Sequence, residues 1–182
     1  MTLKEKAEHI LQASGLLEHL KAYGTPHIIG SLRMDMMAWN DIDIDIENDG
    51  MDLEKLYRLT RFVMDAFHPV WYEAREEADG EEKIVWFQGF EAMIDGEKWN
   101  FDLWFFDRET IEKAETFCDG IAARATPAQR ESITEMKRGL LARGLYSFEK
   151  FRSMDVYRAV LEENIQTIEG FLERYAPGKG TI

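Results

Sequence analysis

The segment Asp41–Glu47 reads Asp-Ile-Asp-Ile-Asp-Ile-Glu, so an isoleucine follows each aspartate. In an extended strand, successive side chains point to opposite faces of the sheet. This period of two predicts a strand with one apolar face and one face of carboxylates. We expect Asp41, Asp43 and Asp45 to project together, with their Cα atoms about 6.5 to 7 Å apart.

Helical and extended patterns on both sides of this strand predict an α+β domain. Apolar residues recur at helical spacing over Leu3–Tyr23 and over Asp52–His68, and a short apolar strand is expected at Thr25–Gly30. Further strands are predicted at 70–75, 83–94 and 97–106. Further helices are predicted at 109–124, from Thr126 onward, and at 155–175.

The pair Asp95-Gly96 separates the last two predicted strands and is a strong signal for a two-residue hairpin. Such a turn pairs residue 94 with residue 97 and places Asp102 opposite Gly89. Asp102 then lies on the face that also carries Trp104. A carboxylate among large apolar groups needs a partner, which is either a metal ion or a bonded Arg or backbone group.

The expected fold is a small mixed, mostly antiparallel sheet backed by helices, with a C-terminal helical tail. The chain has 182 residues, which is too few for two ordinary domains. We therefore expect a single domain over 1–182. Its core and N-terminal helix occupy 1–107, and its helical tail occupies 108–182.

The charge balance restricts the partners of this chain. It has 22 basic and 35 acidic residues, for a formal net charge of −13, which opposes attraction to nucleic acid or anionic lipid. Eight acidic residues and no Lys or Arg lie between Asp35 and Glu54. This part of the chain is expected to attract metal ions.

Other site classes and compartments are disfavoured by what the sequence contains. One cysteine, Cys118, and four scattered histidines do not form the ligand clusters of a zinc site or a disulfide framework. The first residues are charged and lack the pattern of a secretory signal, and no apolar run reaches the length of a membrane span. We expect a cytoplasmic protein with no membrane partner.

Crowded carboxylates on one strand face repel one another, and divalent cations relieve that repulsion. Oxygen ligands at this spacing suit Mg²⁺ or Mn²⁺, including a pair of ions about 3.5 to 4 Å apart. The alternative is a solvated face of an edge strand, where charge discourages aggregation. A calcium loop starting at Asp45 fails because its twelfth position is Leu56 and not the required glutamate.

Gly30-Ser31 ends the short apolar strand, ten residues before Asp41. Glycine lets a ligand approach the backbone, and a serine hydroxyl with neighbouring N–H groups can hold a phosphate. Gly-Ser is also an ordinary turn, so the order of the elements matters. An apolar strand, Gly-Ser, a loop and an acidic strand follow one another.

With a third aspartate on a later strand, this order resembles the nucleotidyltransferase superfamily, which includes the catalytic domain of DNA polymerase β and small antibiotic nucleotidyltransferases. The resemblance covers about residues 25–106. It implies a small mixed sheet backed by helices. It also implies a nucleoside triphosphate and two Mg²⁺ ions on the open face of that sheet.

The resemblance assigns roles to individual positions. Gly30 and Ser31 look like the pair that binds the triphosphate, and Arg33 lies near a position where members often carry a basic residue. Asp41 and Asp43 look like the metal ligands.

Asp102 looks like the third carboxylate, which would bind the catalytic metal and help to deprotonate the acceptor hydroxyl. Asp45 follows Asp43 on the same face, so the metal pair is either Asp41 and Asp43 or Asp43 and Asp45.

The sequence therefore predicts a metal-dependent enzyme that moves a nucleoside monophosphate from a nucleoside triphosphate to a hydroxyl of a small molecule or protein. In-line attack on the α-phosphate needs two metals and little else from the protein. The alternative is a non-catalytic nucleotide- or metal-binding module of the same fold that acts through a partner protein. It is favoured by the few basic residues around Gly30-Ser31. The acceptor, the base preference and the oligomeric state have no sequence signal.

Overall fold

The structure is a computed structural model that describes residues 1–48, 50–78, 84–147 and 149–176. The chain divides into two compact units, Met1–Asp119 and Gly120–Ile182. The boundary lies within the helix α5 (Arg108–Arg124). The single domain with a core at 1–107 and a tail at 108–182 stays a prediction.

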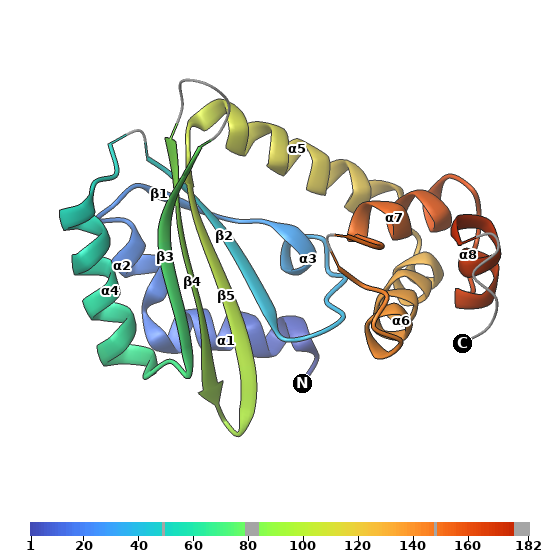
Figure 1. Cartoon of the computed structure of the whole chain (residues 1–182), viewed down its shortest axis with the longest axis horizontal. Coiled ribbons are helices and arrows are strands. Elements are labelled where there is room, and N and C mark those ends of the chain that lie inside the picture. The colour runs from blue at the N-terminus through green and yellow to red at the C-terminus, as the bar shows by residue number, and fades with distance from the viewer. Residues whose placement is uncertain (49, 79–83, 148, 177–182) are drawn as a thin grey trace. The chain divides into compact units, whose positions relative to one another are not determined.

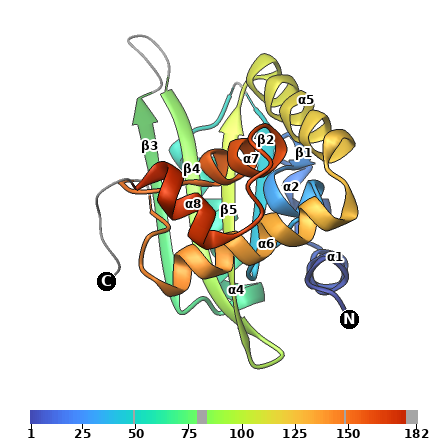
Figure 2. The same cartoon turned by 90° about the vertical axis from the view of Figure 1, so that its right-hand side faces the viewer.

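A five-stranded sheet with the order β1-β2-β5-β4-β3 organises the first unit (Figures 1 and 2). Its strands are β1 (Thr25–Ile28), β2 (Asp41–Glu47), β3 (Trp71–Ala78), β4 (Ile84–Ile94) and β5 (Glu97–Phe106). Strand β2 pairs with β5 in parallel, and the other neighbouring pairs are antiparallel. The α+β class and the mixed, mostly antiparallel sheet are confirmed. The residue predicted to start β4, Lys83, lies outside the described residues.

Helices α1 (Leu3–Ser14), α2 (Leu16–Leu20) and α4 (Leu53–Phe67) pack on one face of the sheet, and further helices form the second unit. The helices α3 (Gly30–Arg33) and α5 also begin in the first unit. Those of the second unit are α6 (Pro127–Ala142), α7 (Ser153–Leu161) and α8 (Ile168–Tyr175). Asp52 and Thr126 are the N-caps of α4 and α6, and each side chain accepts a hydrogen bond from the first turn of its helix.

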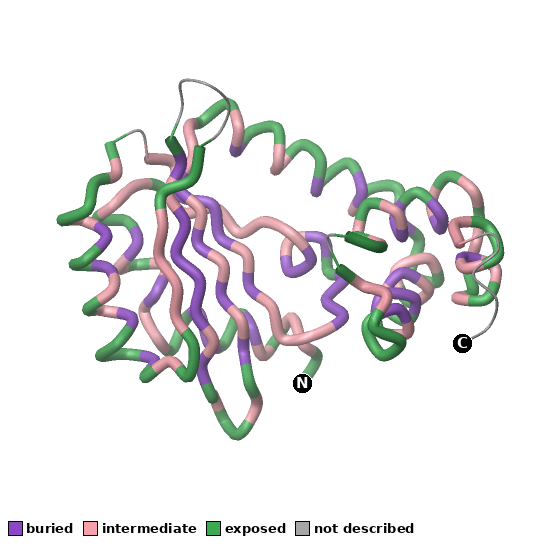
Figure 3. Tube along the Cα trace, in the orientation of Figure 1, coloured by how far each residue is buried: buried purple, intermediate pink, exposed green. Residues whose placement is uncertain are grey.

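The alternation in β2 separates a core face from an open face, as predicted. Ile42, Ile44 and Ile46 are fully buried and belong to one core cluster with apolar residues of α1, α2 and α4. Burial of each such side chain contributes roughly 1.5 to 3 kcal/mol. Buried and partly exposed residues alternate along β5 and along the first part of β2 (Figure 3). The aspartates therefore lie on the face away from this core.

Two predicted helices are each divided in the structure. The helix expected over residues 3–23 breaks at Gly15, whose φ of 68° is left-handed and carries no Cβ penalty in glycine. The helix expected over residues 155–175 breaks between α7 and α8. There Asn164 has a φ of 54°, and the Thr167 side chain caps the N-terminus of α8.

The predicted register of the β4–β5 hairpin is confirmed. Ile94 pairs with Glu97, and Gly89 lies opposite Asp102. Both turn residues between them have positive φ, as a type I′ turn requires.

Within the described ranges, no helix combines the length and the apolar character needed to cross a membrane.

Candidate functional site

The parallel register between β2 and β5 builds the candidate site. It pairs Asp43 with Asp102, two residues after it pairs Asp41 with Asn100. All four side chains belong to the face opposite the buried isoleucines, because side chains alternate along both strands.

Three of the predicted site residues meet here. One carboxylate oxygen each of Asp41, Asp43 and Asp102 can be chosen so that the three atoms lie within 4.8 Å of one another. We call these residues the acidic triad. All three are half-buried, and Asn100 Nδ2 donates to Asp41 Oδ1 at 2.7 Å and to Asp102 Oδ1 at 3.2 Å. Three converging carboxylates are the donor set that hard divalent cations such as Mg²⁺ prefer, so the residues fit such an ion.

The environment of Asp102 disfavours its charged form. The pKa of Asp102 is raised to about 6, mainly by burial and next by the negative charge of Asp41, although the hydrogen bond from Asn100 and the charge of Arg75 oppose the shift. A cation at the triad would remove this repulsion. The electrostatics therefore favour occupation by a positive ion.

Asp45 shares the face of the triad but lies outside that group. The register places it between His27 on β1 and Trp104 on β5, and it is only 7% exposed. The pKa of Asp45 is raised to about 6, mainly by burial; His27 opposes this shift and Glu115 adds to it. The geometry favours Asp41 and Asp43 as the metal pair, because the β5 neighbour of Asp45 is a tryptophan and not an acid.

Gly30 lies against the acidic triad at the start of α3. Its φ is 64°, and a Cβ atom there would come within 2.9 Å of Asp43 Cγ and closer still to a carboxylate oxygen. The backbone N–H of Ile29 donates to the carbonyl of Asp43 at 3.1 Å. Ser31 follows and is 8% exposed. The structure thus brings the predicted Gly-Ser segment beside the second aspartate of the triad.

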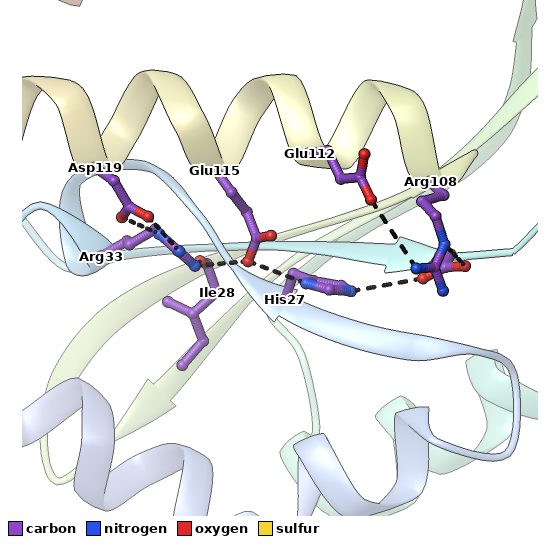
Figure 4. A network of polar contacts seen from close by, with 8 residues as sticks. His27, Ile28, Arg33, Arg108, Glu112, Glu115 and Asp119 are labelled. Carbon is purple, nitrogen blue, oxygen red and sulfur yellow. Dashed lines mark hydrogen bonds and ion pairs between the residues drawn. The ribbon is translucent and has the colours of Figure 1, made fainter.

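Arg33 is engaged by carboxylates of α5 (Figure 4). Its Nε and Nη2 donate to Asp119 at 2.7 and 2.9 Å, and its Nη1 donates to Glu115 at 2.8 Å and to the carbonyl of Ile28 at 3.3 Å. The hydrogen bond to Asp119 is the largest cause that raises the pKa of Arg33, although burial opposes it. Arg33 therefore joins α3 to α5 in this structure.

The contacts of Arg33 belong to a longer network on one side of α5. His27 Nδ1 lies 3.1 Å from Glu115 Oε1, and its Nε2 lies 4.0 Å from Glu47 Oε2. Arg108 Nε contacts Glu47 Oε1 at 3.0 Å. Basic and acidic side chains, from α5 and from the segments beside it, therefore alternate along the network (Figure 4). We call this set the α5 network; its members are His27, Arg33, Glu47, Arg108, Glu115 and Asp119. Sequence reasoning missed these contacts, although residues 108, 112, 115 and 119 have the spacing of one helix face.

The aromatic residues of the strands divide between the two faces of the sheet. Trp99 is 1% exposed and belongs to the core, as is usual for strand tryptophans, whereas Trp71 is 43% exposed. Trp104 packs against Phe87 on the open face, with ring centroids 4.5 Å apart. An aromatic surface thus lies beside the acidic triad.

The fold is similar to that of several solved structures. The chain is similar to a cytoplasmic RNA terminal U-transferase, with a TM-score of 0.54 and 15% identity over 87% of this chain and 46% of that one. It is similar to the Cid1 poly(U) polymerase, with a TM-score of 0.56 and 15% identity over 87% and 48%. The polymerase core of TRAMP, an RNA surveillance complex, gives a TM-score of 0.57 and 16% identity over 97% and 59%.

These solved structures are members of the nucleotidyltransferase superfamily, so the resemblance inferred from the sequence is confirmed at the level of the fold. The chain spans about half the length of the proteins that it matches. No protein-family model matches the sequence, and the comparison with curated proteins found no match.

Proposed function

We propose that this chain is a metal-dependent nucleotidyltransferase that moves a nucleoside monophosphate from a nucleoside triphosphate to a hydroxyl of a small molecule or protein. The observation that carries this proposal is the acidic triad, whose ligand atoms lie within 4.8 Å of one another on the open face of a nucleotidyltransferase fold. The same position and donor set support the binding of a divalent cation together with a polyphosphate.

In the proposed reaction, the acceptor oxygen attacks the α-phosphorus in line, a new P–O bond forms, and the bond to pyrophosphate breaks. Asp41 and Asp43 would hold two Mg²⁺ or Mn²⁺ ions, which stabilise charge on the entering and leaving oxygens when they are bound. Asp102 would complete the ligand set. Its position across from Asp43 supports a role in which it would receive the proton of the acceptor hydroxyl.

The backbone at Gly30 and the hydroxyl of Ser31 would hold the triphosphate. The support is their position, since a side chain at Gly30 would occupy the space beside the Asp43 carboxylate. Arg33 was predicted to contact the nucleotide, but its three guanidinium nitrogens already donate to Asp119, Glu115 and a backbone carbonyl. We therefore assign Arg33 the role of holding α3 in position.

The acceptor class rests on charge. The net charge of −13 and the carboxylates of the open face oppose a polyanionic acceptor more than a neutral or cationic one. The solved structures that the chain resembles include a cytoplasmic RNA terminal U-transferase, so an RNA acceptor is the competing assignment.

A second function, the non-catalytic module, is favoured by one observation. The basic side chain nearest in sequence to Gly30-Ser31, Arg33, is paired with carboxylates, which leaves the phosphate-binding segment with little positive charge of its own. Such a module would bind nucleotide or metal without turnover.

Calorimetric titration of ATP, GTP, CTP and UTP, each with Mg²⁺, with Mn²⁺ and without a divalent cation, tests the proposal. We expect binding that requires the cation and disappears in the Asp41→Asn/Asp43→Asn variant. The matched control is Glu54→Gln/Asp65→Asn, which removes two exposed acids of α4. No binding of any triphosphate by the wild type would make the triad structural and end the proposal.

Turnover separates the enzyme from the binding module. Pyrophosphate release in the presence of hydroxyl acceptors, lost in Asp43→Asn, supports the enzyme. Cation-dependent binding without release for small-molecule, protein and RNA acceptors supports the module.

A further inference from the structure

A compact group of side chains from β3, β4 and β5 lies beside Asp102 on the open face. The registers of β3, β4 and β5 place Arg75, Phe87 and Trp104 in one row across the sheet. The adjacent row consists of Glu73, Gly89 and Asp102. We call Arg75, Phe87 and Trp104, together with Trp71 at their border, the Arg75 shelf.

Arg75 lies over this aromatic surface. Its Cζ atom is 4.4 Å from the centroid of the Phe87 ring and 5.8 Å from that of Trp104. Phe87 is only 6% exposed, whereas 39% of the Arg75 side chain remains exposed. The guanidinium therefore covers a buried ring and presents surface of its own to solvent.

Carboxylates already accept hydrogen bonds from three of the five N–H donors of Arg75. Its Nε and Nη2 donate to Glu77 Oε2 at 3.1 and 3.0 Å, and its Nη1 donates to Glu73 Oε1. A guanidinium binds a phosphate through the same in-plane N–H groups. With three of these N–H groups bonded to carboxylates and 39% of the side chain exposed, stacking of a planar ring on Arg75 is favoured over binding of a phosphate.

The shelf reaches the acidic triad through Gly89. At the point where a Cβ atom of Gly89 would lie, the nearest ring atoms are Cζ of Phe87 at 2.6 Å and Cζ3 of Trp71 at 3.2 Å. Gly89 itself lies directly opposite Asp102. A glycine here lets aromatic rings take the place next to the carboxylate that would accept the hydroxyl proton.

We propose that the Arg75 shelf binds the acceptor by stacking a planar ring on Arg75, and that the acceptor is a ring-bearing alcohol without phosphate groups. This inference rests on the proposed function, because it takes Asp102 as the point that the hydroxyl must reach. Glu73, Glu77 and Asp102 surround the shelf, and their charge repels phosphates while it tolerates a neutral or cationic ring. The shelf thus selects against a polyanionic RNA end.

The test uses adenosine as a phosphate-free planar probe that carries hydroxyls. The full chain is first saturated with Mg²⁺ and a non-hydrolysable ATP analogue, so that the triphosphate site is filled, and adenosine is then titrated by calorimetry. The informative variants are Arg75→Lys, which keeps the charge but loses the planar face, and Trp71→Ala, which removes an exposed ring. Their matched controls are Arg61→Ala and Tyr57→Ala, which remove an exposed guanidinium and an exposed ring of α4.

We expect saturable adenosine binding that weakens about tenfold or more in Arg75→Lys and in Trp71→Ala, and that is unchanged in both controls. The midpoint of urea unfolding checks that each variant is folded. If Arg75→Lys is unfolded, the result for Trp71→Ala decides.

Three results would overturn the inference. They are the absence of saturable adenosine binding, equal affinity in wild type and shelf variants, and tighter binding of a single-stranded oligoadenylate that also depends on Arg75. The ATP analogue reports separately on the proposed function. If the analogue fails to bind with Mg²⁺, the nucleotidyltransferase assignment fails. If the analogue binds and adenosine does not, only the role of the Arg75 shelf as the acceptor site is overturned.

Discussion

Two groups of acidic residues share the open face of β2, and their neighbours differ. In the α5 network, Arg33, His27 and Arg108 stand between the carboxylates. In the acidic triad, the residue that bridges two carboxylates is the neutral amide Asn100. The number of acidic residues alone therefore does not identify a cation site. Such a site is marked by carboxylates that converge without a basic side chain between them.

The largest expected difference between the two groups is in metal-dependent transfer. Asp43→Asn removes a triad ligand and is expected to lower the transfer rate on the order of 10³-fold, because it removes charge stabilisation of the reacting oxygens. Asp45→Asn alters the same strand and face but lies outside the triad, so the rate should stay within about threefold. Pyrophosphate release measures both. Equal losses would restore Asp43 and Asp45 as the metal pair.

Gly30→Ala probes the contact between the Gly-Ser segment and the triad. The new Cβ would lie 2.9 Å from Asp43 Cγ, at a backbone φ of 64°, so the carboxylate or α3 must move. We expect a loss of roughly 10²-fold in Mg²⁺-dependent transfer. Gly120→Ala is the control, since nothing lies within 4 Å of its added Cβ. A fully active Gly30→Ala variant would show that Asp43 tolerates displacement.

The pH dependence of the free energy of unfolding, measured with and without Mg²⁺, tests whether Asp102 and Asp45 differ in their relation to the cation site. Burial raises the pKa of each to about 6, above its value in the unfolded chain, so the folded state binds protons more tightly. The free energy of unfolding contributed by each group therefore increases as the pH falls from about 6 to about 4, by on the order of 2 kcal/mol.

Urea unfolding between pH 4 and pH 7 measures this contribution as the difference between wild type and Asp45→Asn. Saturating Mg²⁺ should stabilise the folded state most above pH 6, where Asp102 is ionised. With Mg²⁺, the contribution of Asp102 to the free energy of unfolding should therefore increase with pH and not decrease. The difference due to Asp45 should persist with Mg²⁺. If the cation abolishes both contributions, Asp45 belongs to the metal site.

Arg33→Ala has the smallest expected effect and tests the α5 network. The substitution leaves Glu115, whose side chain is 26% exposed, without its hydrogen bond from Arg33. We expect the free energy of unfolding to fall by about 1 to 2 kcal/mol, and the KM for the triphosphate to rise more than kcat falls. Arg61→Ala, which breaks an exposed pair on α4, should change stability by less than about 0.5 kcal/mol. A change in kcat alone would return Arg33 to direct contact with the reacting phosphate.

Local signals predicted much of this structure. The Asp95-Gly96 turn set the register that places Asp102 opposite Gly89, because a two-residue turn fixes the pairing of the strands beside it. The alternation of Ile42, Ile44 and Ile46 with aspartates determined which face is buried.

Long-range pairing was not predictable from the same signals. Nothing in β2 reveals that Asp43 and not Asp45 will face Asp102, since that register depends on a strand far along the chain. The pairing of Arg33 with Asp119 depends likewise on where α5 packs. The Arg75 shelf was not predictable from the sequence, because stacking aromatics and core aromatics have the same strand pattern.

The mixed pairing around β5 has a consequence for the order of folding. Gly89 and Asp102 meet once the local β4–β5 hairpin closes, whereas Asn100 and Asp41, which are 59 residues apart, meet only when β2 docks in parallel. The cation site is therefore absent from any intermediate that lacks β2, and Mg²⁺ should slow unfolding without accelerating refolding. Stopped-flow measurements with and without Mg²⁺ would test this order. An accelerated refolding rate would mean that β2 docks before the transition state.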